Sequence, residues 1–480
     1  MRQPRFDFVI LVSFVVSLAS DARSFAQSGD QPKATVTISN STRVESWSYF
    51  TPPPQAGSDP TYTFPANHSE LGVRVDGRRF DIAGTFNYVR IENLPANAIG
   101  PGGLGAGAFY FAAAEVPYSY QLFLGELLLR VKTRDARSAA TIGRMHYASG
   151  LESTTGSPQV ARLKRERLAS RLIGDFEWSQ YQRRFDGVRF DADRPSWHAT
   201  GSVVMPTQGG FEESANLTMP RIQVASASWT RKSPSSEWQV FGQIYRDRRM
   251  PMARPDNSGS LDVPVDVTIG ALGGSFARVS PTRDGELDIV LWGAGEVGDW
   301  YGQSQRAASV AIEAGHRWTN TALRPWIRGG YSYASGDRNP FDDHHGTFFQ
   351  MLPSSRKYAL SAAYTHMNLK DAFVQAWIEP ARFSARVEAH RLDLASAADL
   401  WYQGSGATAS NPARFFGFSG RAASGASSLG TIVETVAAFP IKRFWSINGY
   451  AGTMWGGEVV KRSFSGNRLT FWFIENMIQF

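Results

Sequence analysis

Polar and apolar residues alternate with a period of two through most of this chain. The alternating runs are about ten residues long, and clusters of Gly, Asp, Asn, Pro and Ser separate them. Helical periodicity is nearly absent. This pattern predicts an all-β protein built from many antiparallel strands.

The clearest example is LGVRVDGRRFDIAGTFNYVRIENL at residues 71–94, which predicts a hairpin that turns at Asp76-Gly77. Such a pair tolerates the positive backbone angles of a tight turn. Val73 and Arg74 then face opposite sides of the sheet. Basic residues repeatedly share a face opposite branched aliphatic residues, and we expect the aliphatic face to contact lipid.

The same alternation predicts about 18 strands, at about 25 residues per strand and connection, which suits a pore-sized barrel. Besides the two hairpin strands, the expected strands are Ala34–Phe50, Tyr120–Lys132, Ala136–Tyr147, Arg171–Arg183, Ser196–Met205, Arg221–Arg231, Trp238–Arg246, Val267–Val279, Glu286–Glu296, Ser309–Trp318, Pro325–Ala334, Lys357–Met367, Phe373–Ile378, Phe383–Leu392, Leu429–Phe439, Phe444–Trp455 and Leu469–Phe480.

The start of the chain predicts export. Two arginines precede an apolar run at residues 8–19, which is too short to cross a bilayer as a helix and is typical of a signal peptide. Small residues before Gln27 fit the cleavage rule, so we expect residues 1–26 to be removed; Ser20 and Ala22 offer an earlier site. No later stretch of about 18 apolar residues follows, which excludes spanning helices and leaves a barrel or a soluble protein.

Composition favours the barrel. The chain has no cysteine, although disulfides form readily in an exported protein, so its stability must come from strand pairing or a large core. Aromatic residues make up 13% of the chain at a mean hydropathy of only −0.28, which is typical of membrane barrels with interfacial aromatic girdles and wet interiors. An aromatic-rich soluble β-protein is the alternative.

The last residues decide between the two. RLTFWFIENMIQF alternates apolar and polar positions, with Asn476 as the single break, and finishes on Phe480. A terminal strand of this kind resembles the signal that barrel-assembly machinery recognises in outer-membrane proteins. We therefore predict an all-β transmembrane antiparallel barrel over residues 27–480, in the outer membrane of a Gram-negative bacterium.

A barrel of this kind has short turns on the periplasmic side and longer loops outside. The long connections expected outside are Thr51–Glu70, Pro95–Ser119 and Gly150–Leu168. The glycine-rich stretch PGGLGAGAF at residues 101–109 has the freedom to fold across the mouth.

Five blocks along the chain resemble the alginate-export porins. In order, they are TRVESW (42–47), IGRMHYASG (142–150), RRFDGVRF (183–190), RPWIRGGYSYASGDRNPFDDHHGTFFQMLPSSRKYA (324–359) and HRLDLASAADLWYQGSGA (390–407). The resemblance implies a barrel of 18 strands that passes an anionic polysaccharide or a smaller solute. It implies no cofactor, and we expect a monomer.

The charge balance agrees with an acidic solute. The chain carries 50 Lys and Arg against 43 Asp and Glu, and guanidiniums in a low-dielectric lumen attract anions and donate to carboxylates. The expected lumen residues are Arg74, Arg90, Arg130, Lys132, Arg144, Arg184, Asp186 and Arg189. The alternative is that these cations pair with wall carboxylates and only hold the barrel round; the candidate partners are Glu45, Glu126, Asp186, Glu313 and Glu388.

Two acidic motifs have both a structural and a functional interpretation. Phe185-Asp186-Gly187 lies where the resemblance is densest, but an Asp-Gly pair beside strands is also typical of a turn, and we favour the turn. Asp337, Asp342 and Asp343, followed by two histidines, form a weak candidate for a Ca²⁺ site. A polar loop without an ion is the simpler interpretation.

A basic run at residues 162–167 also has two interpretations. Arg162, Lys164, Arg165 and Arg167 could contact lipopolysaccharide phosphate at the outer surface or form a solvated loop face. Export excludes nucleic acid as a partner.

The sequence contains no sign of catalysis. Neither a Gly-x-Ser-x-Gly elbow nor a His-Glu-x-x-His helix occurs, and His390, two residues after Glu388, has no nucleophile nearby in sequence. We therefore predict a channel and no enzyme. A barrel enzyme acting on lipid or surface polymer is the first alternative, and a secreted two-domain carbohydrate-binding protein is the second.

Overall fold

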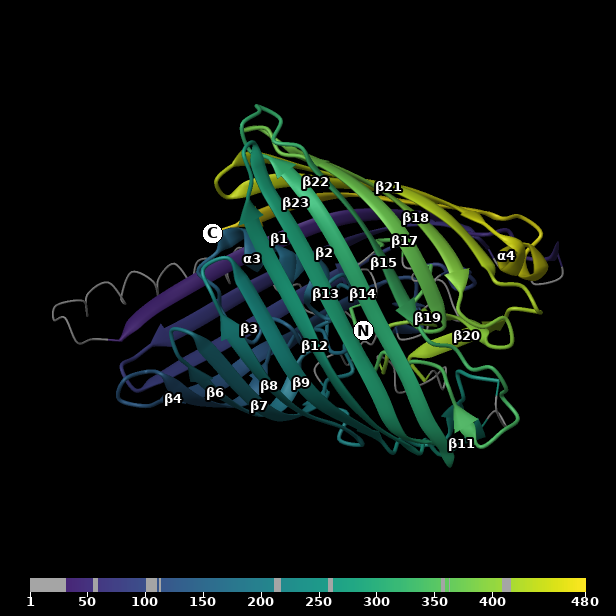
Figure 1. The fold of residues 1–480 in the computed structure, drawn as a ribbon, viewed down its shortest axis with the longest axis horizontal. Helices are drawn as coiled ribbons and strands as arrows, with labels where there is room; N and C mark the ends of the chain where they lie inside the picture. The colour runs from purple at the N-terminus through teal and green to yellow at the C-terminus, as the bar shows by residue number, and fades with distance from the viewer. Residues whose placement is uncertain are drawn as a thin grey trace, which may run out of the picture.

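The computed structural model describes residues 32–54, 59–100, 110–111, 114–210, 217–257, 262–354, 359–361, 363–407 and 416–480. The expected signal peptide (1–26) and the glycine-rich stretch (101–109) lie outside these residues. Within the described chain, eighteen strands form one barrel (Figure 1). They are β1 Lys33–Ser48, β2 Thr61–Asp76, β3 Phe80–Ile91, β4 Ser119–Lys132, β5 Ser138–Met145, β6 Phe185–Asp193, β7 Trp197–Pro206, β8 Ile222–Lys232, β9 Ser236–Asp247, β12 Val267–Pro281, β13 Gly285–Trp300, β14 Gln303–Trp318, β15 Trp326–Ala334, β17 Leu369–Ile378, β18 Ser384–Leu394, β21 Ser428–Lys442, β22 Trp445–Gly456 and β23 Arg468–Gln479.

The barrel closes between its first and last strands. Each strand pairs antiparallel with its neighbour, and β1 pairs with β23 from Ser39 opposite Gln479 to Ser48 opposite Thr470. Closure gives the backbone N–H and C=O groups of every strand a partner, which a membrane-spanning structure requires because lipid offers none. The predicted antiparallel barrel of about 18 strands is confirmed.

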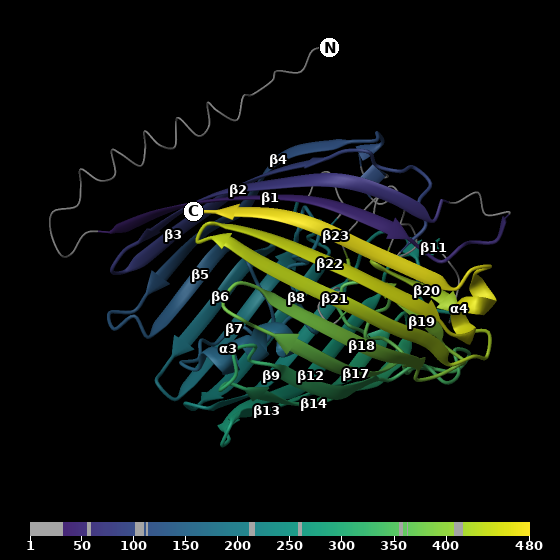
Figure 2. The same cartoon turned by 90° about the horizontal axis from the view of Figure 1, so that it is seen from above.

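The two ends of the barrel differ. Short connections such as 77–79 and 194–196, together with the start of β1 and the end of β23, lie at one end, which we call the turn end. The longest connections, 146–184 and 335–368, leave from the opposite end, the loop end. Figures 1 and 2 show the C-terminus at the turn end and α4 (Glu458–Ser463) at the loop end.

Side chains alternate between the two faces of the wall. Along β13, Leu287, Ile289 and Leu291 are exposed, whereas Asp288 and Trp292 between and beyond them are buried. The exposed aliphatic face continues around the barrel, and its contact with lipid stays a prediction. The buried face looks into the lumen, which is where the chain places its polar chemistry.

Three long connections fold back into the barrel. We call them the first (146–184), second (335–368) and third (395–427) inward segments. Besides irregular backbone they carry short elements: α3 Pro158–Leu163, η3 Lys164–Leu168, β16 His344–His345, β19 Leu400–Gly404 and β20 Phe418–Ala422. A further pair, β10 Met252–Ala253 and β11 Asp262–Val263, lies between β9 and β12.

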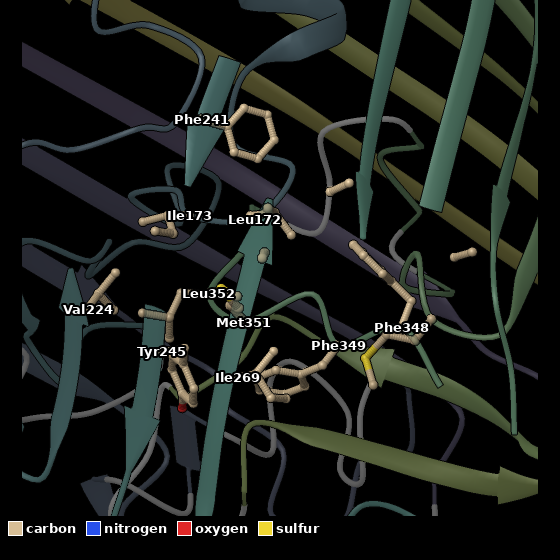
Figure 3. Packing of buried hydrophobic residues seen from close by; sticks show 14 of the residues in the cluster. Leu172, Ile173, Val224, Phe241, Tyr245, Ile269, Phe348, Phe349, Met351 and Leu352 are labelled. Carbon is tan, nitrogen blue, oxygen red and sulfur yellow. The ribbon is translucent and has the colours of Figure 1, made fainter. Parts of the chain in front are cut away.

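The inward segments pack on one another and on the wall. The amide of Leu352 donates to the carbonyl of Leu172 at 2.9 Å, which joins the second segment to the first. Figure 3 shows apolar residues of both segments beside inward residues of β8, β9 and β12 in one buried cluster. The labelled members are Leu172, Ile173, Val224, Phe241, Tyr245, Ile269, Phe348, Phe349, Met351 and Leu352. Burying these side chains holds the segments in the lumen.

The hairpin predicted at Asp76-Gly77 is present, for a different reason than expected. The Gly77 amide donates to the Phe80 carbonyl at 2.9 Å, and Gly77 has no positive φ. A Cβ at Gly77 would lie 2.7 Å from the same carbonyl oxygen. Glycine is therefore needed here for the close approach of two backbone segments.

Several element predictions are wrong. None of the described residues in 171–183 or 357–367 belongs to a barrel strand, because both ranges lie in inward segments. The expected loop Thr51–Glu70 contains the first ten residues of β2. The predicted turn at Phe185-Asp186-Gly187 is instead the start of β6, where a Cβ at Gly187 would lie 2.2 Å from the Val203 carbonyl oxygen.

The last residue continues the terminal strand. Phe480 exchanges backbone hydrogen bonds with Ile38, and its ring stacks on Phe444 with centroids 5.0 Å apart. Recognition of this strand by assembly machinery stays a prediction. No helix in the described chain is long and apolar enough to cross a membrane.

Candidate functional site in the barrel lumen

The first inward segment carries a basic helix down the lumen. Ser157 caps α3 by accepting the Val160 amide at 3.3 Å, and Pro158 occupies the first turn, where its missing N–H costs nothing. Val160 and Leu163 are buried. Figures 1 and 2 place α3 near the turn end, so the segment travels most of the barrel's length.

The basic run of this segment contacts the barrel wall. Lys164 pairs with Glu237 of β9 at 2.5 Å, and Arg162 pairs with Glu379 at 2.5 Å. Arg167 is buried against carboxylates as well, whereas Arg165 is exposed. Neither interpretation of this run, contact with lipopolysaccharide at the outer surface or a solvated loop face, fits Arg162, Lys164 and Arg167, because these three side chains pair with carboxylates inside the barrel.

Glu313 of β14 is the centre of the largest charge cluster. Its carboxylate accepts hydrogen bonds from Arg167 at 2.7 and 3.1 Å, from Arg171 at 3.2 Å and from Arg328 at 3.0 Å. Arg328 also donates to Asp288 at 3.0 Å. All five side chains are at least nine-tenths buried, so these are charge-assisted bonds in a low-dielectric interior.

A second cluster lies at the turn end. Arg162 and Arg317 share the carboxylate of Glu379. The Arg162 guanidinium also lies over the rings of Trp326 and Trp377, at 4.7 and 3.8 Å from their centroids. Stacking on aromatic faces adds to the ion pair and fixes the plane of the guanidinium.

Arg183 ties the three inward segments together. Its guanidinium donates to four carbonyl oxygens, those of Gly174, Leu352, Ser405 and Ala407, at 2.8 to 3.3 Å. The side chain is fully buried with no carboxylate in contact, and this burial lowers the pKa of Arg183 to about 9. The Leu352 carbonyl also accepts the Gly174 amide at 2.8 Å, whereas the Gly174, Ser405 and Ala407 carbonyls lie outside the barrel strands and accept from Arg183.

Most of the predicted lumen residues face the interior. Lys132 and Arg74 lie 2.7 and 3.7 Å from Asp81 near the turn end. Arg189 donates to Asp191 at 2.9 Å. Arg130 forms no ion pair among the described residues, and its buried Nε has no hydrogen-bond partner.

Arg184 follows Arg183 in the sequence and is buried as well. It donates to the Arg183 carbonyl at 3.1 Å and to the Gln182 side chain at 2.6 Å. Burial lowers the pKa of Arg184, and the nearby carboxylates Asp175 and Glu70 oppose this shift. The cation thus lies close to lumen carboxylates but forms no direct ion pair with one in the described chain.

Arg90 is on the wrong face for a lumen residue. Arg90 shares the exposed face of β3 with Tyr88, whereas Val89 and Ile91 on either side of it face inward and are fully buried. Arg90 pairs with Glu92 and lies over the ring of Tyr120 at 5.3 Å, on the outer surface near the loop end. Its predicted lumen position is corrected.

Arg144 and Asp186 neutralise each other. Two parallel hydrogen bonds of 2.8 Å join them across β5 and β6, and Thr218 donates to the same carboxylate. The hydrogen bonds from Arg144 and Thr218 stabilise the ionised form of Asp186, which makes it a structural partner of Arg144. The pair adds no net charge to the lumen.

The candidate Ca²⁺ ligands do not converge. Asp337 is buried and accepts the Asn339 amide at 3.2 Å, whereas Asp342 and Asp343 are exposed. In the described chain, one group of three potential ligands brings its atoms within 4.8 Å of one another, and it contains Glu388, His390 and Glu434 instead.

One triad-like arrangement bears on the enzyme alternative. His198 lies 3.0 Å from Asp193 and 2.8 Å from the hydroxyl of Thr200. That hydroxyl donates its proton to Asp191 at 2.8 Å. A nucleophile must give its proton to the histidine, so this geometry supports a structural hydrogen-bond network.

The sequence did not reveal the ion pairs of Glu379, or that Glu313 binds three arginines at once. Glu313 occupies an inward position of a strand that was predicted correctly, and its alternation with Ile312 marked it as a lumen residue. The missing information was the partner, because Arg167 and Arg171 lie more than 140 positions away in sequence.

Comparison with known proteins agrees with the fold and identifies the family. The alginate-export family profile matches residues 130–470, and no curated protein sequence matches the chain. Among solved structures, OccAB4 of Acinetobacter baumannii superposes with a TM-score of 0.57 at 8% identity, covering 94% of this chain and all of that one. A BenF-like porin of Pseudomonas fluorescens Pf-5 gives the same values.

A third similar structure is OccK2 (OpdF) of Pseudomonas aeruginosa in complex with glucuronate, with a TM-score of 0.54 at 8% identity over 95% of this chain and 98% of that one. At such low identity these structures support the barrel fold alone. The family profile covers more than half of the chain and the barrel is closed, so this protein belongs to the alginate-export family and is an outer-membrane channel of a Gram-negative bacterium.

Proposed function

We propose that the barrel passes an acidic solute, either a small sugar acid or an anionic polysaccharide, along the basic side chains of its lumen. The observation that carries this proposal is Arg130 of β4, an inward-facing cation that forms no ion pair among the described residues. A cation without a counter-charge in a low-dielectric lumen attracts anions and can donate hydrogen bonds to a carboxylate.

Two of the similar structures were solved with small acidic molecules, and this is why a small acidic solute is worth testing on this chain. One neighbour was solved with glucuronate, and another, OpdK of Pseudomonas aeruginosa, with vanillate, at a TM-score of 0.55 and 6% identity over 93% of this chain and 98% of that one. Both molecules carry one carboxylate. The inward segments also reduce the space for a polymer in the lumen.

The test is single-channel recording with residues 27–480 refolded into planar bilayers. We expect conductance steps whose reversal potential in a KCl gradient indicates anion selectivity, with block by glucuronate or by polyuronate and none by neutral sugars. Block by the monomer alone supports the small solute, and block by polyuronate alone supports the polymer. A folded barrel with cation-selective or unblocked steps would contradict the proposal.

Arg130 and Arg90 form a matched pair of variants. Arg130→Gln removes a lumen cation without an ion-pair partner in the described chain, so anion selectivity should fall, by at most about fivefold for one charge screened by water. Arg90→Gln removes the same charge from the outer surface and should leave selectivity unchanged. Equal effects of both variants would show that the lumen charge does not set selectivity.

A further inference from the structure

Two strands of the wall bring two carboxylates and an imidazole together in the lumen. Glu388 and His390 are two residues apart on the inward face of β18, and Glu434 of β21 lies directly opposite Glu388 in the register. The potential ligand atoms of the three side chains lie within 4.8 Å of one another. Each side chain is at most 2% exposed.

The imidazole is held as a metal-binding histidine is usually held. Asp371 of β17 lies 2.9 Å from Nδ1 of His390, which fixes the ring and leaves Nε2 as the nitrogen that can bind a ligand. Nε2 is buried and has no hydrogen-bond partner in the described chain. A buried ring nitrogen without a partner is costly, and a bound cation would satisfy it.

The carboxylates also lack hydrogen bonds that burial requires. Among the described residues, neither oxygen of Glu388 has a hydrogen-bond partner, although Arg386 lies 3.3 Å and Arg167 lies 3.8 Å away. Both arginines are shared, because Arg167 donates to Glu313 and Arg386 reaches Glu166 at 3.4 Å. The two arginines therefore only partly balance Glu388.

Glu434 has partners that orient it without neutralising it. It accepts the hydroxyl of Tyr450 at 2.8 Å and the Leu360 amide at 3.2 Å. No ion pair joins Glu434 to a cation in the described chain. Glu388 and Glu434 are thus two neighbouring carboxylates in a low-dielectric site, an arrangement that a dication between them would stabilise.

We propose that Glu388, His390 and Glu434 bind one divalent transition-metal ion in the lumen, with Asp371 as the positioning residue of His390. One imidazole nitrogen and two carboxylate oxygens form a mixed N/O ligand set that suits Zn²⁺ and its neighbours in the first transition row. The ion would link β18 to β21 and would compete with Arg167 for Glu388. This inference is independent of the solute that the channel passes.

The experiment measures metal content. Residues 27–480 are refolded in detergent with Zn²⁺, because the ligands are buried, and are then dialysed against a chelator-treated buffer before elemental analysis. We expect about one Zn²⁺ per barrel. Refolding with Co²⁺ should give the visible absorption bands of a bound ion with nitrogen and oxygen ligands. Metal-free wild-type protein that is folded by heat-modifiability would overturn the proposal and favour a proton shared by the two carboxylates.

Variants assign the ligands. His390→Ala and Glu434→Gln should each remove most of the metal, whereas His68→Ala, at a histidine of β2 whose ring contacts the Asn87 amide, should retain it. Asp371→Asn should raise the Kd for Zn²⁺ roughly 10- to 100-fold, as loss of an outer partner does. Equal metal content in His390→Ala and wild type would contradict the assignment. If His390→Ala does not fold, the Asp371→Asn affinity and the wild-type stoichiometry decide.

Discussion

Glu313→Gln is the most direct test of how the first inward segment is held. The substitution keeps the size of the side chain and removes the charge that Arg167, Arg171 and Arg328 share. Arg328 keeps its bond to Asp288 and Arg171 keeps its bond to the Arg167 carbonyl. The remaining guanidiniums are buried without a full counter-charge.

The magnitude follows from these contacts. Four hydrogen bonds to a charged acceptor would give about 6–12 kcal/mol if they were additive, but the retained partners reduce the loss. Removing one partner of a buried ion pair costs about 3–5 kcal/mol. We expect segment docking to weaken by that amount, or about two to three and a half powers of ten in the docking equilibrium.

Two measurements check this prediction. Limited proteolysis should cut the Glu313→Gln barrel within residues 146–184 much faster than wild type, and planar bilayers should show larger, noisier and more anion-selective conductance. Glu458→Gln, which removes an exposed carboxylate of α4, is the control and should match wild type. Wild-type proteolysis and conductance of Glu313→Gln would refute the role of this cluster.

Three further predictions concern the same interior. Arg183→Met removes the Arg183 donor from the Gly174, Ser405 and Ala407 carbonyls of the first and third inward segments, at about 1–3 kcal/mol each. Hydrogen exchange should be faster in these two segments, and unchanged protection would contradict this prediction. Burial lowers the pKa of His366 to about 3. The free energy of unfolding that the neutral imidazole contributes above pH 6.5 should therefore be lost as the pH falls towards 3, by about 2–3 kcal/mol at pH 4.5. Thermal unfolding should show a smaller loss in His366→Asn. Gly187→Ala should lower the melting temperature because its Cβ would lie 2.2 Å from the Val203 carbonyl oxygen, and an unchanged value would refute this.

The lumen residues show the limit of sequence reasoning for the site. Arg130 and Lys132 lie on the inward face of β4 because they alternate with the exposed Leu129 and Val131, and a strand has only two faces. Arg90 was assigned to the wrong face, since its neighbours Val89 and Ile91 are apolar but pack on inward segments at the loop end. An apolar residue in this barrel can face either lipid or a packed lumen.

The basic run at 162–167 shows the same limit for a loop. A sequence of four cations looks alike whether it is solvated or buried against carboxylates, and Glu237, Glu313 and Glu379 are far away along the chain. The proposed metal site also depends on a residue that is distant in sequence. The spacing of Glu388 and His390 is visible in the sequence, but Glu434 joins them only through the pairing of β18 with β21.

The sequence by itself determined the strands, because the period of two follows from a wall with lipid on one side, and each strand carries that pattern locally. It also determined the closed barrel, since a chain with many such strands and no spanning helix has no other way to pair its backbone in lipid. Tertiary structure alone decided what fills the lumen. Residues 171–183 alternate like a strand, yet they belong to no barrel strand. Side chains such as Arg183 hold them instead, and its partners come from its own segment and from two segments that are distant in sequence.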